Sequence, residues 1–311
     1  AVLDAPLSAV DAIVQHHRAL RIERDADPTA TPADGTVQAV AYAAARRLGF
    51  VDGDAQCVAQ AWARRSAHRP FDPADWPDDP ADFGFDPPAA RFAPCPHRLG
   101  LYAVLPDAAW VARLARAGVP TLQLRFKHPD PQRIALEVRA AVAAVRGTPA
   151  QLFINDHWRD AIDAGAYGVH LGQEDLDALT TDDLARLRDS GLRLGLSTHG
   201  YAEMARAWRV GPSYLALGAV FPTTLKVMPT APQGPQRLAH YARVAREVPT
   251  VAIGGIGLAE LPAIAASGVG SFAVVRAITG ADAPEAAATS LMRAWARLQT
   301  GAQERRAGEG L

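Results

Sequence analysis

The sequence predicts an α/β protein: a (β/α)8 TIM barrel with a short, mostly helical N-terminal extension. Downstream of Arg98, eight short apolar runs occur within about 200 residues, and amphipathic stretches of roughly ten to eighteen residues separate them. Regular alternation of this kind is typical of parallel α/β folds, and eight repeats match the barrel. An open doubly wound sheet is the alternative, but it usually has fewer strands, and no G-x-G-x-x-G follows the first run.

Each expected element can be placed along the chain. The apolar runs that we interpret as strands are LGLYAVL, VPTLQLR, QLFI, GVHL, LRLGLS, YLALG, TVAI and SFAVV. The stretches that we interpret as helices cover residues 107–117, 129–146, 157–165, 176–190, 200–210, 235–247, 257–267 and 282–298. Upstream, alanine-rich helices are expected at 36–48 and 53–66, with another within 7–23.

These patterns divide the chain into four parts. Residues 1–69 form the helical extension, and residues 70–97 form a linker rich in proline and aspartate, through which neither helix nor central strand can run. The barrel covers residues 98–300, and residues 301–311 are expected to be a disordered tail.

Composition argues against several classes of function. The formal net charge is −1, so we expect no nucleic-acid partner, and no apolar run is long enough to span a membrane. No secretory signal is recognisable at the N-terminus. The two cysteines, Cys57 and Cys95, have neither metal-ligand spacing nor enough partners for a disulfide framework. The expected location is therefore cytoplasmic.

The ends of the second, third and fourth strands predict a diphosphate and metal site, because barrel active sites lie at the carboxyl ends of the strands. Strand alternation places Gln123, Arg125 and Lys127 on one side, and two cations beside an amide suit a diphosphate. Asp156 and Asp175 follow neighbouring strands, so they can face one another and hold Mg²⁺. The alternative for Asp175 is to cap the helix that follows, and Glu174 is expected to face solvent.

A second anion site is predicted on the opposite side of the barrel mouth. Glycines after the seventh strand let bare amides approach a phosphate, and phosphate sites at strands seven and eight recur in this fold. The residues expected around it are Thr223, Thr224 and Lys226 in the long loop 218–234, Gly255 after strand seven, and Val275 and Arg276 after strand eight. Ser197, after strand five, either contacts a ligand or caps the next helix, and His199 is a weak candidate for acid–base work. Two anion sites suggest an enzyme that joins two phosphorylated small molecules.

Six runs together resemble the thiamine-phosphate synthase family. They are QLRFK, FINDHWRDAIDAGAYGVHLGQEDL, GLSTH, ALGAVFPTTLK, APQG and VAIGGI, and they lie between Leu101 and Ile278 in the family's order. The resemblance implies an enzyme that condenses 4-amino-2-methyl-5-hydroxymethylpyrimidine diphosphate with 4-methyl-5-(2-phosphoethyl)thiazole, giving thiamine phosphate and diphosphate. It also implies a dissociative, Mg²⁺-assisted reaction without an enzyme nucleophile.

The resemblance assigns roles by position. It implies that Asp156 and Asp175 hold Mg²⁺. The residues implied for the pyrimidine diphosphate are Gln123, Arg125, Lys127, Asn155, Ser197 and Lys226, and those for the thiazole phosphate are Thr223, Gly255, Val275 and Arg276. Two departures fall in the thiazole half. The family's Thr-x-Thr-Lys reads Thr-Thr-Leu-Lys here, with Leu225 in place of a hydroxyl that Thr224 can replace, and its usual Val-Ser at strand eight reads Val275-Arg276.

The extension carries a fainter resemblance. Its run ADGTVQAVAYAAARRLGFVDGDAQCVAQAWARRS is similar to the C-terminal helices of hydroxymethylpyrimidine phosphate kinase. Only Asp34-Gly35-Thr36 remains of that family's anion-binding turn, and the nucleotide-binding sheet is missing. We therefore expect no kinase activity, but a degenerate remnant that packs on the barrel.

Two other functions stay open on the sequence. One is a thiazole tautomerase-like relative, which shares the barrel but lacks the diphosphate and metal residues. The other is a non-catalytic thiamine phosphate-binding protein, which Leu225 and Arg276 favour. A homo-oligomer, or docking with a pyrimidine phosphate kinase, is also left open.

Overall fold

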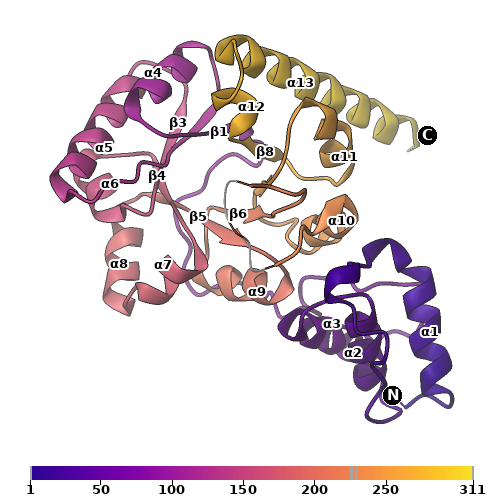
Figure 1. Cartoon of the computed structure of the whole chain (residues 1–311). Coiled ribbons are helices and arrows are strands. Elements are labelled where there is room, and N and C mark those ends of the chain that lie inside the picture. The colour runs from indigo at the N-terminus through magenta and orange to yellow at the C-terminus, as the bar shows by residue number, and fades with distance from the viewer. Residues whose placement is uncertain (1, 225–226, 228–229, 310–311) are drawn as a thin grey trace.

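A closed barrel of eight parallel strands forms the larger part of the molecule (Figure 1). The computed structural model describes residues 2–224, 227 and 230–309, with side chains to residue 302. The strands are β1 (Gly100–Leu105), β2 (Thr121–Leu124), β3 (Gln151–Asn155), β4 (Gly168–Leu171), β5 (Arg193–Thr198), β6 (Tyr214–Leu217), β7 (Thr250–Ala252) and β8 (Ser271–Val274). Tyr102 of β1 pairs with Thr121 on one side and with Ala273 on the other, which closes the barrel. The predicted (β/α)8 fold is confirmed.

Helices surround the barrel in the predicted order. They are α4 (Ala108–Arg116), α5 (Pro131–Val145), α6 (Trp158–Ala164), α7 (Gln173–Ala178), α8 (Thr181–Asp189), α9 (Tyr201–Val210), α10 (Gly234–Val244), the 3-10 turn η3 (Leu258–Glu260), α11 (Leu261–Ala266), α12 (Arg276–Thr279) and α13 (Pro284–Glu309).

Two expected elements differ in detail. The helix expected at 176–190 is two helices, because Thr180 caps a new one and exchanges hydrogen bonds with Asp183. A disordered tail was expected at residues 301–311. This expectation was wrong for residues 301–309, because α13 continues as a helix through Glu309.

The extension contains α1 (Pro6–His16), the 3-10 turns η1 (Arg18–Leu20) and η2 (Glu23–Asp25), α2 (Val37–Arg47) and α3 (Asp52–Arg65). The linker at 70–97 holds neither helix nor strand, as its prolines predict, yet Trp76, Phe83, Phe85 and Phe92 are buried. In Figure 1 the extension, in indigo, lies beside α9 and α10. The exact limits of the four parts remain predictions.

Extension and barrel meet in a buried contact that we call the seam, formed by Asp54, Leu20 and Leu48 of the extension with Ala202 and Arg237 of the barrel. The Ala202 N–H donates to the Asp54 carboxylate at 2.8 Å. Arg237 donates to the Leu20 carbonyl at 2.8 Å and to the Leu48 carbonyl at 3.0 Å. Because these charged groups are buried and bonded across the contact, the extension packs on the barrel as expected. Its descent from a kinase remains a prediction.

In the described part of the chain, no helix is both long enough and apolar enough to cross a membrane.

Candidate functional site

The two predicted metal ligands lie on adjacent strand ends and face each other. Asp156 follows β3 with a φ of 64°, a left-handed conformation that aspartate tolerates better than most residues. Its N–H donates to the His170 carbonyl of β4 at 3.0 Å, which fixes the turn. Asp175 lies in the first turn of α7 and accepts from the Gly172 N–H at 3.0 Å. Asp175 therefore caps its helix and also interacts with Asp156, so the two alternatives for this residue are compatible.

The electrostatics of this pair suit a divalent cation. Burial and the neighbouring Asp156 carboxylate raise the pKa of Asp175. Burial also acts to raise the pKa of Asp156, but the hydrogen bond and charge of Lys127 outweigh it and hold that pKa below its usual value. Two facing carboxylates are oxygen donors of the kind Mg²⁺ prefers, so the pair fits that ion. The described residues add no third acidic, histidine or cysteine group to a cluster here, and Glu174 is exposed.

The three residues predicted for the diphosphate, Gln123, Arg125 and Lys127, differ in exposure. Gln123 is buried inside the barrel, whereas Arg125 and Lys127 are exposed. β2 ends at Leu124, although the Arg125 N–H still donates to the Leu105 carbonyl at 2.8 Å, so a shared face for all three residues stays a prediction. Lys127 still forms an ion pair with Asp156. Within the described part of the chain, the Arg125 guanidinium makes no hydrogen bond or ion pair.

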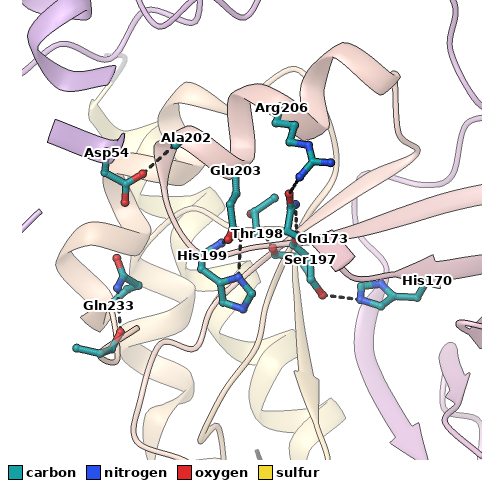
Figure 2. A network of polar contacts seen from close by, with 12 residues as sticks. Asp54, His170, Gln173, Ser197, Thr198, His199, Ala202, Glu203, Arg206 and Gln233 are labelled. Carbon is teal, nitrogen blue, oxygen red and sulfur yellow. Dashed lines mark hydrogen bonds and ion pairs between the residues drawn. The ribbon is translucent and has the colours of Figure 1, made fainter. Parts of the chain in front are cut away.

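A chain of hydrogen bonds crosses the barrel interior from Gln123 to Ser197, and we call it the interior chain. Gln123 donates to the Tyr102 hydroxyl at 2.7 Å, and that hydroxyl lies 2.7 Å from the hydroxyl of Tyr214. The Tyr214 hydroxyl lies 2.6 Å from His170 Nδ1, and His170 Nε2 lies 2.8 Å from Ser197 Oγ (Figure 2). Five strands are thereby linked beneath the mouth.

The middle of the interior chain holds a neutral imidazole. Burial lowers the pKa of His170 to about 4, so the ring is neutral near pH 7 and carries one hydrogen. One ring nitrogen therefore donates and the other accepts, and the tautomer decides whether Ser197 or Tyr214 receives the hydrogen. In either direction the chain couples the Ser197 hydroxyl to the buried hydroxyls of Tyr214 and Tyr102.

Sequence reasoning missed Tyr102, Tyr214 and His170 as members of this network. Each lies within an apolar run and is buried, so its pattern is that of a core residue. The available signal was polarity: buried hydroxyls and imidazoles need partners, and three of them on strands of one barrel can supply one another.

The histidine considered for acid–base work, His199, is bound to the helix that follows it. Its Nδ1 lies 2.7 Å from the Glu203 carboxylate of α9, which also accepts from the His199 N–H at 2.9 Å (Figure 2). Ser197 points instead to His170, and its carbonyl accepts from Gln173 at 2.8 Å. We therefore interpret His199 as a structural residue at the start of α9.

Neither hydroxyl before α9 caps that helix. Thr198 donates to the Ala216 carbonyl at 2.9 Å, and the helix begins after Gly200, which has no side chain to cap it. The cap comes from the extension, where Asp54 accepts from Ala202 (Figure 2). Ser197 is thus free of a capping role.

The loop after β6 is tied to the end of β7. The Val220 N–H donates to the Ile253 carbonyl at 2.9 Å, and the Phe221 N–H donates to the Gly254 carbonyl at 3.0 Å. These bonds extend the ladder beyond the strands and bring the loop over the glycines.

Among the residues predicted for the second anion site, Arg276 contacts Thr224, and Gly255 lies beneath Phe221 and Pro222, which precede Thr223. Gly255 has a φ of 64°, and a Cβ there would lie 2.5 Å from the Pro222 carbonyl oxygen, so only glycine fits beneath the loop. Arg276 of α12 donates to the Thr224 hydroxyl at 2.6 Å, and Thr223 is the adjoining residue.

The remaining predicted residues are placed more simply. Val275 directly precedes α12, and Asn155 is buried at the end of β3. Leu225 and Lys226 lie outside the described residues, so their roles stay predictions.

Comparisons with known proteins agree with this arrangement. Residues 101–278 match the family model described as thiamine monophosphate synthase. The thiamine-phosphate synthase of Neisseria meningitidis serogroup A is 53% identical over 204 residues, which are 66% of this chain and 98% of that protein. That of Escherichia coli O6:H1 is 55% identical, over 61% of this chain and 89% of that protein.

A solved structure agrees with the sequence comparisons. Thiamine phosphate pyrophosphorylase from Pyrococcus furiosus superposes with a TM-score of 0.55 at 25% identity, and the match covers 64% of this chain and 96% of that one. About a third of this chain therefore has no counterpart in these relatives. The barrel, the paired carboxylates and the matched segment together lead to one conclusion: the chain belongs to the thiamine monophosphate synthase family.

Proposed function

We propose that the chain condenses 4-amino-2-methyl-5-hydroxymethylpyrimidine diphosphate with 4-methyl-5-(2-phosphoethyl)thiazole, forming thiamine phosphate and releasing diphosphate. The observation that carries the proposal is the facing pair Asp156 and Asp175, with Lys127 on it and Arg125 nearby in the chain. Membership of the family, and named relatives at more than 50% identity, support the same activity.

Asp156 and Asp175 would hold Mg²⁺, which would neutralise charge that develops on the departing diphosphate. The ammonium of Lys127 already lies against Asp156, so it is positioned to bind the same diphosphate. The exposed Arg125 guanidinium offers planar, bidentate binding to phosphate oxygens. Both cations then stabilise charge that appears in the transition state of a dissociative reaction.

The interior chain would orient the pyrimidine. Ser197 lies at the end of the interior chain, where its hydroxyl would hydrogen-bond a ring nitrogen of the pyrimidine. Gln123 and Asn155 lie on the neighbouring strands β2 and β3, and both are buried. No residue of this set needs to act as a nucleophile, because the thiazole nitrogen captures the pyrimidine-methyl cation.

The thiazole phosphate would bind on the opposite side of the mouth. Gly255 lets backbone amides approach it, and Thr223 and Arg276 offer a hydroxyl and a guanidinium. Val275 would contact the ring end of this substrate, and Lys226 would contact the diphosphate.

One assay tests the proposal and separates the alternatives. The purified chain receives both substrates with and without Mg²⁺, and released diphosphate is followed. We expect turnover that requires Mg²⁺. A tautomerase-like relative would release no diphosphate, and a non-catalytic protein would bind thiamine phosphate without turnover; either result would refute the synthase. We also propose a cytoplasmic location, which fractionation of cells would test.

A further inference from the structure

The N-terminal extension reaches the loop that follows β6, where the second anion site lies. We propose, building on the function proposed above, that Arg24 of the extension binds the phosphate of the thiazole substrate. The extension would then be part of the substrate site and not only a packed remnant. Since about a third of this chain has no counterpart in the compared relatives, this contribution would distinguish the chain from them.

The segment that carries Arg24 is held by backbone bonds on both sides. The Ile22 N–H donates to the Leu48 carbonyl at 2.9 Å, and the Asp27 N–H donates to the Arg46 carbonyl at 3.0 Å. The position of η2 within the extension is therefore fixed.

The same segment is also fixed relative to the barrel. Arg237 of α10 binds the Leu48 carbonyl and lies 3.6 Å above the ring of Phe50. The β6 loop ends where α10 begins, and α10 carries Arg237. Arg237 and Ile22 both bind the Leu48 carbonyl, so the segment with Arg24 is held beside the end of that loop.

A pocket lies between this segment and the loop. Of the residues proposed above for the thiazole phosphate, it is lined by Thr223 but not by Gly255, Val275 or Arg276. It has a volume of about 330 Å³, and its walls include Arg24, Ala219, Phe221, Pro222, Thr223, Thr224, Val227, Thr230 and Pro232. All of these except Arg24 belong to the loop. The extension thus supplies the guanidinium of a pocket that the barrel otherwise builds.

The pocket has the chemistry of a phosphomonoester site. The Thr230 hydroxyl oxygen is buried, and it has no hydrogen-bond partner among the described residues. A buried hydroxyl without a partner is costly, and a phosphate oxygen would satisfy it. Thr223 and Thr224 add two hydroxyls, and none of the described lining residues is acidic. Arg24 also pairs with Asp25 at 3.5 Å, outside the pocket lining, and its side chain is still 58% exposed and accessible to a ligand.

The same chemistry argues against the diphosphate as the occupant. A Mg²⁺-bound diphosphate needs carboxylates beside it, and these lie at Asp156 and Asp175 after β3 and β4. Arg276 donates to Thr224, so the threonines of the loop have a guanidinium from α12 as well as the one from the extension. Phosphate is bound well by arginine together with hydroxyl donors.

The test compares Arg24→Gln with Arg18→Gln in the full-length chain. Arg18 is an exposed arginine of the same extension that does not line the pocket, so it is a matched control. For Arg24→Gln we expect the KM for the thiazole phosphate to rise about tenfold, the usual loss for one charge-assisted bond. The KM for the pyrimidine diphosphate, kcat and the melting temperature should stay close to wild type. Arg24→Lys should restore part of the loss, and Arg18→Gln should change nothing.

A second measurement tests binding in the pocket independently of turnover. Calorimetry measures binding of the thiazole phosphate alone to the wild type and to Arg24→Gln, whether or not the chain turns over. Weaker binding only in Arg24→Gln supports the pocket even if no diphosphate is ever released. Equal binding by both proteins overturns the inference even if the chain is an active synthase. A rise in both KM values together would also overturn it.

Discussion

Buried or partly buried carboxylates occur in two regions of this molecule, the seam and the barrel mouth after β3 and β4. The two regions differ in the partners that they give these carboxylates. In the seam, Asp54 accepts a backbone hydrogen bond from Ala202, and Arg237 lies near enough to lower its pKa. In the mouth, Asp156 and Asp175 face each other, with Lys127 as their cation. The seam gives its one carboxylate a backbone donor and a nearby guanidinium from the chain, although burial still raises its pKa to about 6, whereas the mouth sets two carboxylates against one ammonium.

The difference predicts opposite responses to mutation. A residue whose partners lie within the chain contributes to stability, and its removal exposes unsatisfied groups. A residue placed for a ligand often costs stability, so its removal affects function and spares the fold. Mutations in the mouth should therefore change turnover, and mutations in the seam should change stability.

The largest effect is expected in the mouth. Asp156→Asn and Asp175→Asn should each lower kcat by about a hundredfold or more, because each removes a proposed metal ligand beside the leaving group. The urea midpoint should be unchanged or slightly higher in Asp175→Asn, because burial of a charge and repulsion by Asp156 are relieved, and slightly lower in Asp156→Asn, which loses its ion pair with Lys127. Steady-state release of diphosphate at saturating Mg²⁺, together with urea unfolding, measures both quantities.

Glu174→Gln is the matched control, since Glu174 adjoins Asp175 but is exposed. It should retain full activity. Wild-type turnover in both aspartate variants would end the metal assignment.

The next largest effect is expected in the seam. Arg237→Met should lower the free energy of unfolding by about 2–4 kcal/mol, because the Leu20 and Leu48 carbonyls lose a charged donor. Arg243→Met, an exposed arginine of the same helix, should lie within about 0.5 kcal/mol of wild type in the same urea titration. Equal stability of the two variants would show that the seam does not hold the extension on the barrel.

Asp54 gives a finer test through pH. Burial raises the pKa of Asp54 to about 6 in the folded chain, from an ordinary value of 3.8. The folded state therefore binds this proton more tightly than the unfolded state, and stability falls as pH rises from about 4 to about 6. The size is on the order of 2–3 kcal/mol. Arg237 and His199 oppose the shift, and Glu203 adds to it.

Asp54→Asn should remove this slope and keep the cap, because an amide oxygen can still accept from Ala202. Urea midpoints between pH 4 and 7 measure the slope. Asp52→Asn, an exposed change on the same helix, should leave the slope as it is in wild type. A slope that survives in Asp54→Asn would assign it to another group.

The same comparison explains how much could be predicted from the sequence. The eight strands and the pairing of Asp156 with Asp175 follow from periodicity and from the rule that parallel strand ends meet. The sequence pattern does not show that β2 ends at Leu124, so it could not indicate that Lys127 lies beyond the strand. The contacts of the seam could not be predicted from the sequence, since Asp54 is paired with a backbone group 148 residues away in sequence. Local patterns report periodicity and turns but not which distant group satisfies a buried charge.

The smallest effect is expected in the interior chain, which lies between the buried core and the mouth. Tyr214→Phe removes the hydroxyl between Tyr102 and His170, so His170 Nδ1 loses its hydrogen-bond partner. Stability should fall by about 1 kcal/mol, the usual value for one hydrogen bond. Because His170 no longer has a fixed hydrogen position, Ser197 should bind the pyrimidine less well, and the KM for the pyrimidine diphosphate should rise a few-fold.

Tyr167→Phe is the control, since Tyr167 packs near Phe153 in the barrel but is not part of the interior chain. The KM for the thiazole phosphate should not change in either variant. If Tyr214→Phe loses stability with both KM values unchanged, the interior chain belongs with the seam as a purely structural network. If the KM for the pyrimidine diphosphate rises alone, the interior chain belongs with the mouth, because its hydrogen bonds then orient a ligand through residues that never touch it.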